Sequence, residues 1–374
     1  MPTELPPRLR AHCVSQLPTQ TILTHHWLTR RRGGEKVLEA LYDLTDDAAV
    51  YTLIADPAGY RGPWSRQFES PLRNIPGARK HYPKLLGLLP WAARGTKLPP
   101  ADLVLCSDAS LAKAMRAAPG SRVVCYCHSP MRYVWEPRVR AAYAAALTPL
   151  ARPIFHASAR RAQLADAEAA TRVDLFIANS QHVAARIRQH YGRDSIVVHP
   201  PVELPSSPTT GPRDDYYLCV GQHVPYKRLD LAIEACAQLG KRLVVIGGGP
   251  DVARFQKETL AHVSFLGWQP DEVVHQHYRQ ARGLLFCGEE DFGIVPVEAQ
   301  AYGCPVIAYG LGGATETVVD QHTGVLFSEQ STPEVTAALQ LAETLSFDPE
   351  VMFEHCQQFS LDRFHREILA AISS

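Results

Sequence analysis

Two short apolar runs alternate with two helix starts in the second half of the chain, and this alternation constrains the fold more than any other feature. The run Gly283–Cys287 is short enough to be a buried strand. The pattern then predicts a helix over Gly293–Tyr302, because a proline falls in its first turn and Gly303 follows as a stop. A second strand over Pro305–Ala308 leads to a helix that starts at Ala314. Strand, helix, strand and helix in this order predict a parallel sheet covered by helices.

The loop between the first of these strands and its helix carries acidic residues beside a helix N-terminus. Unpaired N–H groups and the positive helix end favour an anion, typically a phosphate, and Gly312 and Gly313 let the backbone approach it closely. Glu290 lies in the loop and Glu298 on the first turn of the helix, so both can face one crevice. A Glu near a helix N-terminus is also an ordinary stabiliser of the helix, and this alternative stays open for Glu298.

The rest of the chain repeats the order of strand and helix on both sides of one linker. Further strands are predicted at residues 21–24, 50–54, 103–106, 123–127, 175–178, 196–198, 217–220, 242–246, 263–268 and 325–327. Further helices are predicted at residues 37–44, 137–170, 181–191 and 231–239. Residues 199–215 are rich in Pro, Ser, Thr and Gly, and this composition marks a domain boundary.

These elements predict an α/β protein with two Rossmann-like domains. A chain of 374 residues is long enough for two domains with a core each. We assign residues 1–198 to the first domain, 199–215 to the linker and 216–348 to the second domain. Residues 349–374 are predicted to be helical.

Residues at the ends of several predicted strands are candidates for ligand contacts, because ligands of open α/β sheets collect at strand C-termini. Gly33 and Gly34 follow the first strand and precede a helix, which is an arrangement that cradles phosphate. Lys227 follows the first strand of the second domain, and its compact positive charge suits a diphosphate. His128 follows a strand of the first domain, although a lone His is more often structural.

The motif around the two acids resembles the signature of a known enzyme family. Glu290 and Glu298, with Phe292–Ile294 between them, resemble the motif of retaining glycosyltransferases of family GT4, which have the GT-B fold. The string His-Ser-Pro-Met-Arg-Tyr-Val-Trp-Glu at residues 128–136 resembles a branch that contains bacterial mannosyltransferases of surface polysaccharide assembly. The resemblance covers nearly the whole chain. It implies two facing domains and a C-terminal helix that returns to the first domain.

The resemblance also implies a role for each residue of the site. The first Glu contacts the donor sugar, the second Glu binds the ribose hydroxyls, and the amides after Phe292 contact the sugar and the diphosphate. The implied catalytic residues are Glu290, His128 and Lys227. The implied donor-binding residues are Gly33, Gly34, Gln222, Lys227, Arg228, Phe265, Leu266, Glu290, Phe292, Gly293, Ile294, Val295 and Glu298.

One position departs from the family pattern. The family usually has an Arg where this chain has Gln222, so that two cations face the leaving group. A Gln donates only neutral hydrogen bonds. Binding of the diphosphate is therefore expected to be weaker, unless Arg228 or an Arg of the first domain supplies the second cation.

Composition restricts where the protein works. No apolar run approaches the roughly 20 residues of a membrane span, and residues 1–8 lack a signal-peptide core. The nine cysteines are scattered and fall mostly in apolar strands, as reduced core cysteines do. We expect a cytoplasmic protein.

The net charge of zero hides a difference between the two halves of the chain. Residues 1–200 hold 27 Lys and Arg against 15 Asp and Glu, and residues 201–374 hold 11 against 23. Residues 72–99 contain several cations and no acid, which favours an anionic membrane surface on the inner face of the cytoplasmic membrane. A core helix with a basic outer face is the alternative. The candidate acceptor or membrane residues are Arg79, Lys80, Lys84, Trp91, Arg132 and Tyr133.

The reaction implied by the resemblance is hexose transfer from a nucleotide sugar to a membrane-associated, lipid-linked saccharide. Branch resemblance favours mannose from GDP-mannose, with a UDP-sugar donor as an alternative. We expect no metal and no other cofactor, because backbone N–H groups and Lys227 can neutralise the leaving diphosphate. A non-catalytic partner subunit that binds a nucleotide sugar and a nucleotide-sugar epimerase are further alternatives. Nothing indicates a nucleic-acid partner, and the glycines at 247–249 lack the spacing of a nicotinamide-binding loop.

Overall fold

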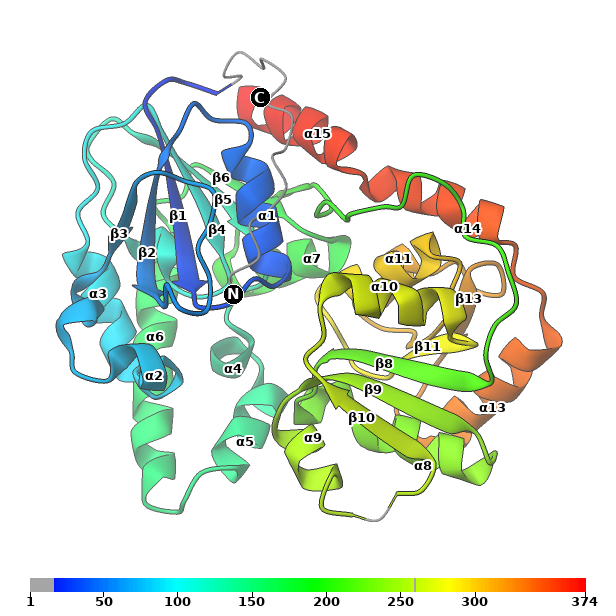
Figure 1. Cartoon of the computed structure of the whole chain (residues 1–374). Helices are drawn as coiled ribbons and strands as arrows, with labels where there is room; N and C mark the ends of the chain where they lie inside the picture. The colour runs from blue at the N-terminus through cyan, green and yellow to red at the C-terminus, as the bar shows by residue number, and fades with distance from the viewer. Residues whose placement is uncertain (1–16, 259) are drawn as a thin grey trace.

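The computed structural model describes residues 17–258 and 260–374, and it contains two parallel sheets, one in each lobe of the molecule (Figure 1). The first sheet has the strand order β3-β2-β1-β4-β5-β6-β7, and the second has the order β10-β9-β8-β11-β12-β13. The strands of the first sheet are β1 (Thr21–Leu28), β2 (Ala49–Ala55), β3 (Gln67–Glu69), β4 (Leu103–Asp108), β5 (Arg122–Cys127), β6 (Leu175–Ala178) and β7 (Ile196–Val197). The strands of the second sheet are β8 (Tyr216–Gln222), β9 (Arg242–Gly248), β10 (Val263–Gly267), β11 (Gly283–Phe286), β12 (Val306–Tyr309) and β13 (Gly324–Phe327).

Helices connect most of the successive strands and cover both faces of each sheet (Figure 1). The helices of the first domain are α1 (Gly33–Tyr42), α2 (Ala78–His81), α3 (Leu89–Gly95), α4 (Arg132–Trp135), α5 (Pro137–Ala145), α6 (Ala151–Ala170) and α7 (Gln181–Tyr191). The helices that follow are α8 (Leu229–Gln238), α9 (Pro250–Phe255), α10 (Asp271–Gln280), α11 (Ile294–Ala301), α12 (Ala314–Thr317), α13 (Thr332–Thr344), α14 (Pro349–Cys356) and α15 (Leu361–Ser373). Short 3₁₀ turns are η1 (Pro71–Asn74), η2 (Tyr82–Lys84), η3 (Leu86–Leu88), η4 (Ala112–Ala114), η5 (Pro225–Lys227) and η6 (Gln357–Phe359).

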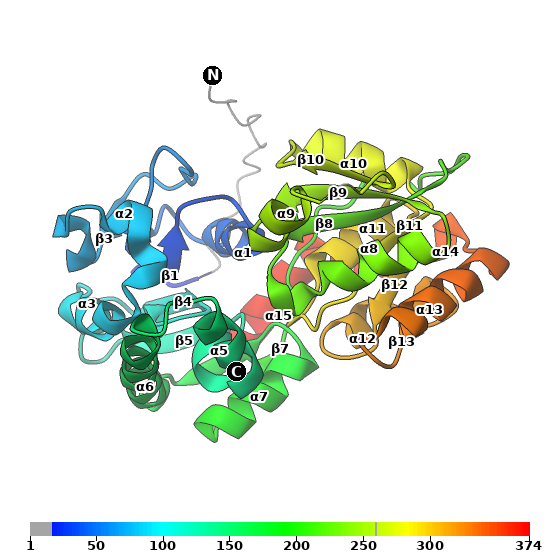
Figure 2. The ribbon, with the colours of Figure 1, turned by 90° about the horizontal axis from the view of Figure 1, so that it is seen from below.

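Burial explains why the central strands read as continuous apolar runs. Helices lie on both faces of each sheet, so strand side chains on either face leave water. All six residues of β4 and all four of β11 are buried. The two sheets lie side by side when the molecule is seen from below, and residues 198–215 connect them without a strand of either sheet (Figure 2). The expected absence of a signal-peptide core concerns residues before Leu17, which lie outside the described residues.

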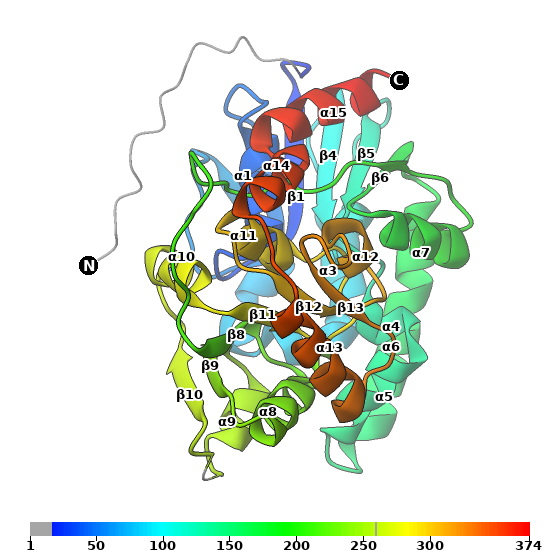
Figure 3. The same cartoon turned by 90° about the vertical axis from the view of Figure 1, so that its right-hand side faces the viewer.

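The C-terminal helices divide between the two domains, and the predicted return to the first domain is confirmed. Near α14, Cys356 and Phe359 pack with Phe292 of the second domain. Helix α15 instead lies along the first domain, where Phe364 and Ile368 are fully buried in that domain's core (Figure 3). Its amphipathic sequence therefore completes a core that residues far upstream begin.

Two predicted helices differ in extent from the observed ones. The helix predicted over Val37–Leu44 begins at Gly33, because the carboxylate of Glu35 accepts a hydrogen bond from the Arg32 N–H at 3.0 Å and so satisfies one free donor at the helix start. The long helix predicted over 137–170 is broken into α5 and α6 by residues 146–150.

The basic segment predicted as one amphipathic surface is a chain of short helical pieces, η1 to α3. Its apolar side chains Leu72, Leu86 and Leu89 are buried in the first-domain core. The apolar side of this segment is therefore occupied by the protein itself, which agrees with the alternative of a core element with a basic outer face.

Candidate functional site

The loop that follows β11 is held by close backbone approaches that only glycine permits. A Cβ on Gly288 would lie 2.6 Å from the Cα of Lys227, and a Cβ on Gly313 would lie 2.2 Å from the Cα of Phe292. Gly293 precedes α11 with a φ of +95°, a conformation that other residues rarely adopt. The glycines recognised in the sequence thus pack three loops together at the carboxyl edge of the second sheet.

The two predicted acids are each paired with a lysine. Glu290 Oε1 lies 3.1 Å from Lys227 Nζ, beside a pocket of about 20 Å³ that both residues line. Glu298 is buried, and its Oε1 accepts a hydrogen bond of 3.1 Å from Lys36 Nζ of the first domain. Tyr278 donates a second hydrogen bond, of 3.3 Å, to Glu298 Oε2. Both carboxylates therefore have a positively charged partner in the unliganded protein.

Lys36 joins the two domains at this point. Burial alone would lower its pKa, but the charges of Glu298 and Asp271 hold the pKa of Lys36 above its ordinary value. Lys36 is thus charged near neutral pH, and the sequence analysis did not single it out. Its position three residues after Gly33 was the available signal.

The N-termini of α1 and α11 face each other across the domain interface. A Cβ on Gly33 would lie 2.7 Å from Cδ1 of Ile294, so a larger residue would have to displace the end of the Ile294 side chain. Gly34 lies beside two imidazole rings, since a Cβ there would lie 3.6 Å from Cε1 of His25 and 3.8 Å from Nε2 of His128. The structure therefore brings the two predicted phosphate-binding turns together.

His128 is a neutral histidine at the end of β5. Its Nε2 lies 2.8 Å from Oγ of Ser107, and its ring packs edge-on against that of Tyr126. Burial, followed by the nearby charge of His25, lowers the pKa of His128 to about 3. The imidazole therefore acts as a neutral hydrogen-bonding group at physiological pH.

An interdomain ionic cluster beside the site was not predicted. Arg186 of α7 contacts Glu136 at 3.0 Å, Glu289 at 2.8 Å and the carboxylate of Asp291. Ser129 also donates to Oδ1 of Asp291 at 3.1 Å. The sequence showed an acidic run at 289–291, but its cationic partner lies more than 100 residues away in the chain.

Arg132 lies at the domain contact, whereas Tyr133 packs on the core of the first domain. Arg132 donates to the backbone carbonyl of Glu289 at 2.9 Å, and its guanidinium lies 4.7 Å from the centre of the Tyr226 ring. Tyr133 packs against Tyr143 with ring centres 5.8 Å apart. Arg132 therefore joins the two lobes, and Tyr133 belongs to the first domain alone.

The remaining predicted donor residues occupy different surroundings. Gln222 is exposed at the end of β8. Arg228 donates to the carboxylate of Asp230 at 2.8 Å and 3.1 Å and to the carbonyl of Gln330, so its guanidinium is engaged within the second domain. In this state Arg228 does not replace the missing cation at position 222.

Of three further predicted donor residues, two pack against hydrophobic core clusters and one is exposed. Phe265 packs on the second-domain core from the edge strand β10, and the neighbouring Leu266 is exposed. Val295 packs against the other core cluster of this domain.

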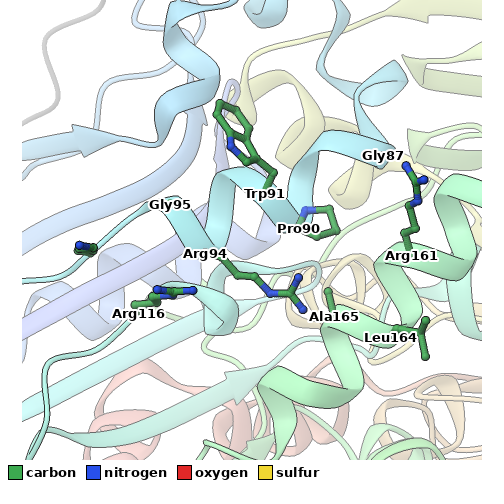
Figure 4. Close-up of a pocket in the computed structure, with 10 residues that line it drawn as sticks. Gly87, Pro90, Trp91, Arg94, Gly95, Arg116, Arg161, Leu164 and Ala165 are labelled. Atoms are coloured by element: carbon green, nitrogen blue, oxygen red, sulfur yellow. The ribbon is translucent and has the colours of Figure 1, made fainter.

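Of the predicted membrane residues, Trp91 lines a separate pocket of about 710 Å³ between α3 and α6 (Figure 4). Trp91 is 54% exposed at its rim. Lys80 and Lys84 are exposed on the preceding turns, and Arg79 is paired with Glu69 at 2.9 Å. The four cations that line the pocket are Arg94, Lys97, Arg116 and Arg161.

Two family models match adjoining parts of the chain. The model described as Glycosyltransferase Family 4 matches residues 18–204, and the model described as Glycosyl transferases group 1 matches residues 204–359. The two matches meet within the predicted linker.

Curated relatives share part of their length with this chain. The D-inositol 3-phosphate glycosyltransferase of Gordonia bronchialis is 31% identical over 242 residues, which cover 54% of this chain and 52% of the relative. The GDP-mannose-dependent alpha-(1-6)-phosphatidylinositol monomannoside mannosyltransferase of Mycolicibacterium smegmatis is 33% identical over 141 residues, or 33% of this chain and 37% of that protein. The chain spans about half the length of the curated relatives it matches first.

Solved structures match nearly the whole chain. Anabaena Alr3699/HepE in complex with UDP-glucose has a TM-score of 0.65 at 18% identity, with 95% of this chain and 99% of that chain covered. WaaG, a glycosyltransferase involved in lipopolysaccharide biosynthesis, has a TM-score of 0.58 at 17% identity, with coverages of 94% and 98%. This likeness confirms the GT-B fold predicted from the sequence.

Proposed function

This chain belongs to glycosyltransferase family 4, and on that premise we propose that it transfers a hexose from a nucleotide sugar to a saccharide acceptor with retention of anomeric configuration. One observation carries the proposal. The N-termini of α1 and α11 meet at Gly33 and Ile294, with Glu290 and Lys227 beside them. Facing helix N-termini and a lysine are suited to a diphosphate, and an adjacent carboxylate is suited to sugar hydroxyls.

The proposed reaction places negative charge on the departing diphosphate. The N–H groups at the start of α11 and the ammonium of Lys227 neutralise that charge as the sugar–phosphate bond breaks. Lys227 must leave Glu290 to do so, which frees the Glu290 carboxylate to orient the sugar and steady its positive charge. We propose that the acceptor attacks from the same face and that the leaving phosphate takes up the acceptor proton.

We further propose mannose from GDP-mannose as the donor. Support comes from the resemblance of residues 128–136 and from the relative whose name specifies GDP-mannose. A thermal-shift panel of GDP- and UDP-sugars tests the choice, because a ligand at 100 times its dissociation constant stabilises the folded protein by about 2.7 kcal/mol. A larger shift with UDP-glucose than with GDP-mannose would replace mannose by the UDP-sugar alternative.

Transfer itself is tested with purified protein, donor and a lipid-linked saccharide acceptor. We expect product to form at the same rate with and without a chelator of divalent metals, since Lys227 and backbone N–H groups neutralise the diphosphate. Tight donor binding with neither transfer nor hydrolysis would make the protein a non-catalytic binding subunit.

We propose that the acceptor is reached at an anionic membrane surface, through the face that α3 and α6 form. Three cations of its pocket, Lys97, Arg116 and Arg161, have no ion-pair partner within residues 17–258 and 260–374. The tip between α5 and α6 adds exposed apolar side chains, since Leu150 is 88% and Ile154 is 69% exposed. Cations around exposed apolar groups favour an anionic lipid surface.

This location is a proposal about the inner face of the cytoplasmic membrane. Among the helices of the described residues, none has both the length and the apolar character needed to cross a bilayer. The eight described cysteines are all free and buried, which suits a reducing compartment.

Flotation with liposomes tests the membrane proposal. We expect binding to vesicles with anionic lipid at low salt and weaker binding at high salt. The variant Leu150→Asp with Ile154→Asp should reduce binding, whereas Leu341→Asp, an exposed change on the second domain, should not. Equal binding by both variants would remove the tip from the proposal, and no binding to anionic vesicles at low salt would end it.

A further inference from the structure

A continuous series of polar side chains runs from α1 to the end of β5. Ser107 Oγ lies 2.8 Å from Nε2 of His128 and 3.0 Å from Nδ1 of His25. On its other edge, His25 Nε2 faces Oε1 of Glu35 at 3.8 Å. His25 and Ser107 are fully buried and Glu35 is nearly so, which leaves His128 as the partly exposed end of the series.

The hydroxyl of Ser107 has one proton for two imidazole nitrogens. It therefore donates to one ring and accepts an N–H from the other. If it donates to His25, then His128 carries its proton on Nε2. If it donates to His128, then His25 carries its proton on Nδ1 and presents a bare Nε2 towards Glu35.

Glu35 distinguishes these two arrangements. Glu35 lies in the first turn of α1 and its Oε2 accepts the N–H of Arg32 at 3.0 Å, and both the helix N-terminus and this hydrogen bond favour the ionised carboxylate. A bare, buried Nε2 of His25 beside this anion is repelled, whereas an Nε2–H is attracted. His25 Nε2 has no hydrogen-bond partner in the described part of the chain, and Glu35 Oε1 at 3.8 Å is the acceptor it faces. The arrangement with the His25 proton on Nε2 is therefore favoured.

Neighbouring charges do not reverse this choice. Asp108 follows Ser107, but its carboxylate accepts the N–H of Ser110 at 2.8 Å and lies 3.0 Å from Nζ of Lys113. The choice holds for a neutral His25, because a doubly protonated ring would donate its Nδ1 proton to Ser107 and reverse the series.

We propose that Glu35, His25 and Ser107 are positioning residues that hold the proton of His128 on Nε2. His128 then presents a bare Nδ1, which accepts a hydrogen bond from a hydroxyl group of the bound hexose and cannot donate one. This inference rests on the proposed glycosyl transfer for the identity of the ligand. The tautomer itself is a property of the unliganded protein.

Nitrogen NMR of protein labelled at histidine measures the tautomer without any substrate. At pH 8 we expect His128 to be protonated at Nε2 with a lone pair at Nδ1. In Ser107→Ala and in Glu35→Gln we expect a mixture of both tautomers, because the hydroxyl relay or the deciding anion is lost. The control Glu39→Gln, in the same helix but bonded to Arg31 and Tyr60, should leave the tautomer unchanged.

Kinetics provide the second measurement. Ser107→Ala should lose one neutral hydrogen bond to the sugar, which predicts a kcat about 10-fold lower than that of the wild-type protein. The KM for the donor should stay within about 2-fold of the wild-type value. A protonated Nδ1 on His128, an imidazolium at His25, or an unchanged kcat in both variants would overturn the proposal. If the unchanged protein transfers no sugar, the NMR result still decides the tautomer, so the two proposals fail separately.

Discussion

The two sides of the candidate site differ in how their functional groups hold charge. On the second-domain side, Glu290 pairs with Lys227 and Glu298 with Lys36, so each carboxylate lies beside an ammonium group. On the first-domain side, His128 is half-buried beside Ser107 and keeps no charge at neutral pH. In the proposed function these two sides have different roles, since the ionic side neutralises a diphosphate and the neutral side contacts hydroxyl groups.

Among changes on the ionic side, we expect the largest effect from Glu290→Gln. The change keeps the size of the side chain but removes the charge that steadies the sugar as it turns positive, so kcat should fall by about 100-fold or more. Steady-state kinetics of sugar transfer measure this. The control Glu272→Gln, an exposed acid on α10, should leave kcat unchanged. A fall of less than about 5-fold would contradict the assigned role.

Glu298→Gln tests the nucleotide end of the same side. A hydrogen bond to a charged group contributes about 1.5–3 kcal/mol, so the neutral amide should weaken binding of the nucleoside diphosphate by about 10- to 100-fold. Titration calorimetry measures the dissociation constant. Unchanged affinity would mean that Glu298 serves only the helix and Lys36, as the alternative in the sequence analysis allowed.

Acid titration tests the neutral side. An unfolded histidine binds its proton near pH 6.5, whereas folded His128 does so near pH 3. The unfolded state therefore binds more protons between these values, and the free energy of unfolding falls as the pH drops below about 6.5. At pH 5 the unprotonated His128 lowers the free energy of unfolding by about 2 kcal/mol relative to neutral pH.

Urea unfolding at pH 7 and pH 5 measures that loss. His128→Gln should recover about 2 kcal/mol of it, and His156→Gln, an exposed histidine on α6, should recover none. Equal losses in all three proteins would show that His128 is not held neutral.

The smallest effect is expected from Lys36→Met. Lys36 occupies the carboxylate that the ribose needs, so its removal should tighten nucleotide binding by a few-fold at most, after the cost of leaving Glu298 unpaired. The double variant with Glu298→Gln should bind like Glu298→Gln alone, because coupled residues are not additive. Additive effects in calorimetry would place Lys36 outside the ribose site.

The sequence predicted what local patterns determine and missed what depends on distant partners. The glycine-rich turns and the strands around Gly33 and Gly293 follow from local patterns, and they lie where expected. Lys36–Glu298 and Arg186–Asp291 join residues of different domains, and no spacing along the chain indicates them. The proposed tautomer of His128 likewise depends on distant parts of the chain, because β1, β4, the end of β5 and α1 meet around Ser107.

The segment at residues 72–99 shows a different limit. Its alternation of cations and apolar residues is expected both for a segment on a membrane surface and for a core element. The same apolar side chains can be buried in lipid or in the protein core. Burial of Leu72 and Leu89 shows that the protein core takes them. Only the exposed cations and Trp91 are left for a partner.

The crossing of α15 has a consequence for biosynthesis. The ribosome completes β1 to β7 long before it makes Phe364 and Ile368, yet these side chains fill the core beneath Tyr126 and Leu38. Until α15 is made, the nascent first domain therefore has an exposed apolar groove, which favours aggregation and chaperone binding. An isolated fragment of the first domain should be poorly soluble, and adding a synthetic α15 peptide in trans should rescue it.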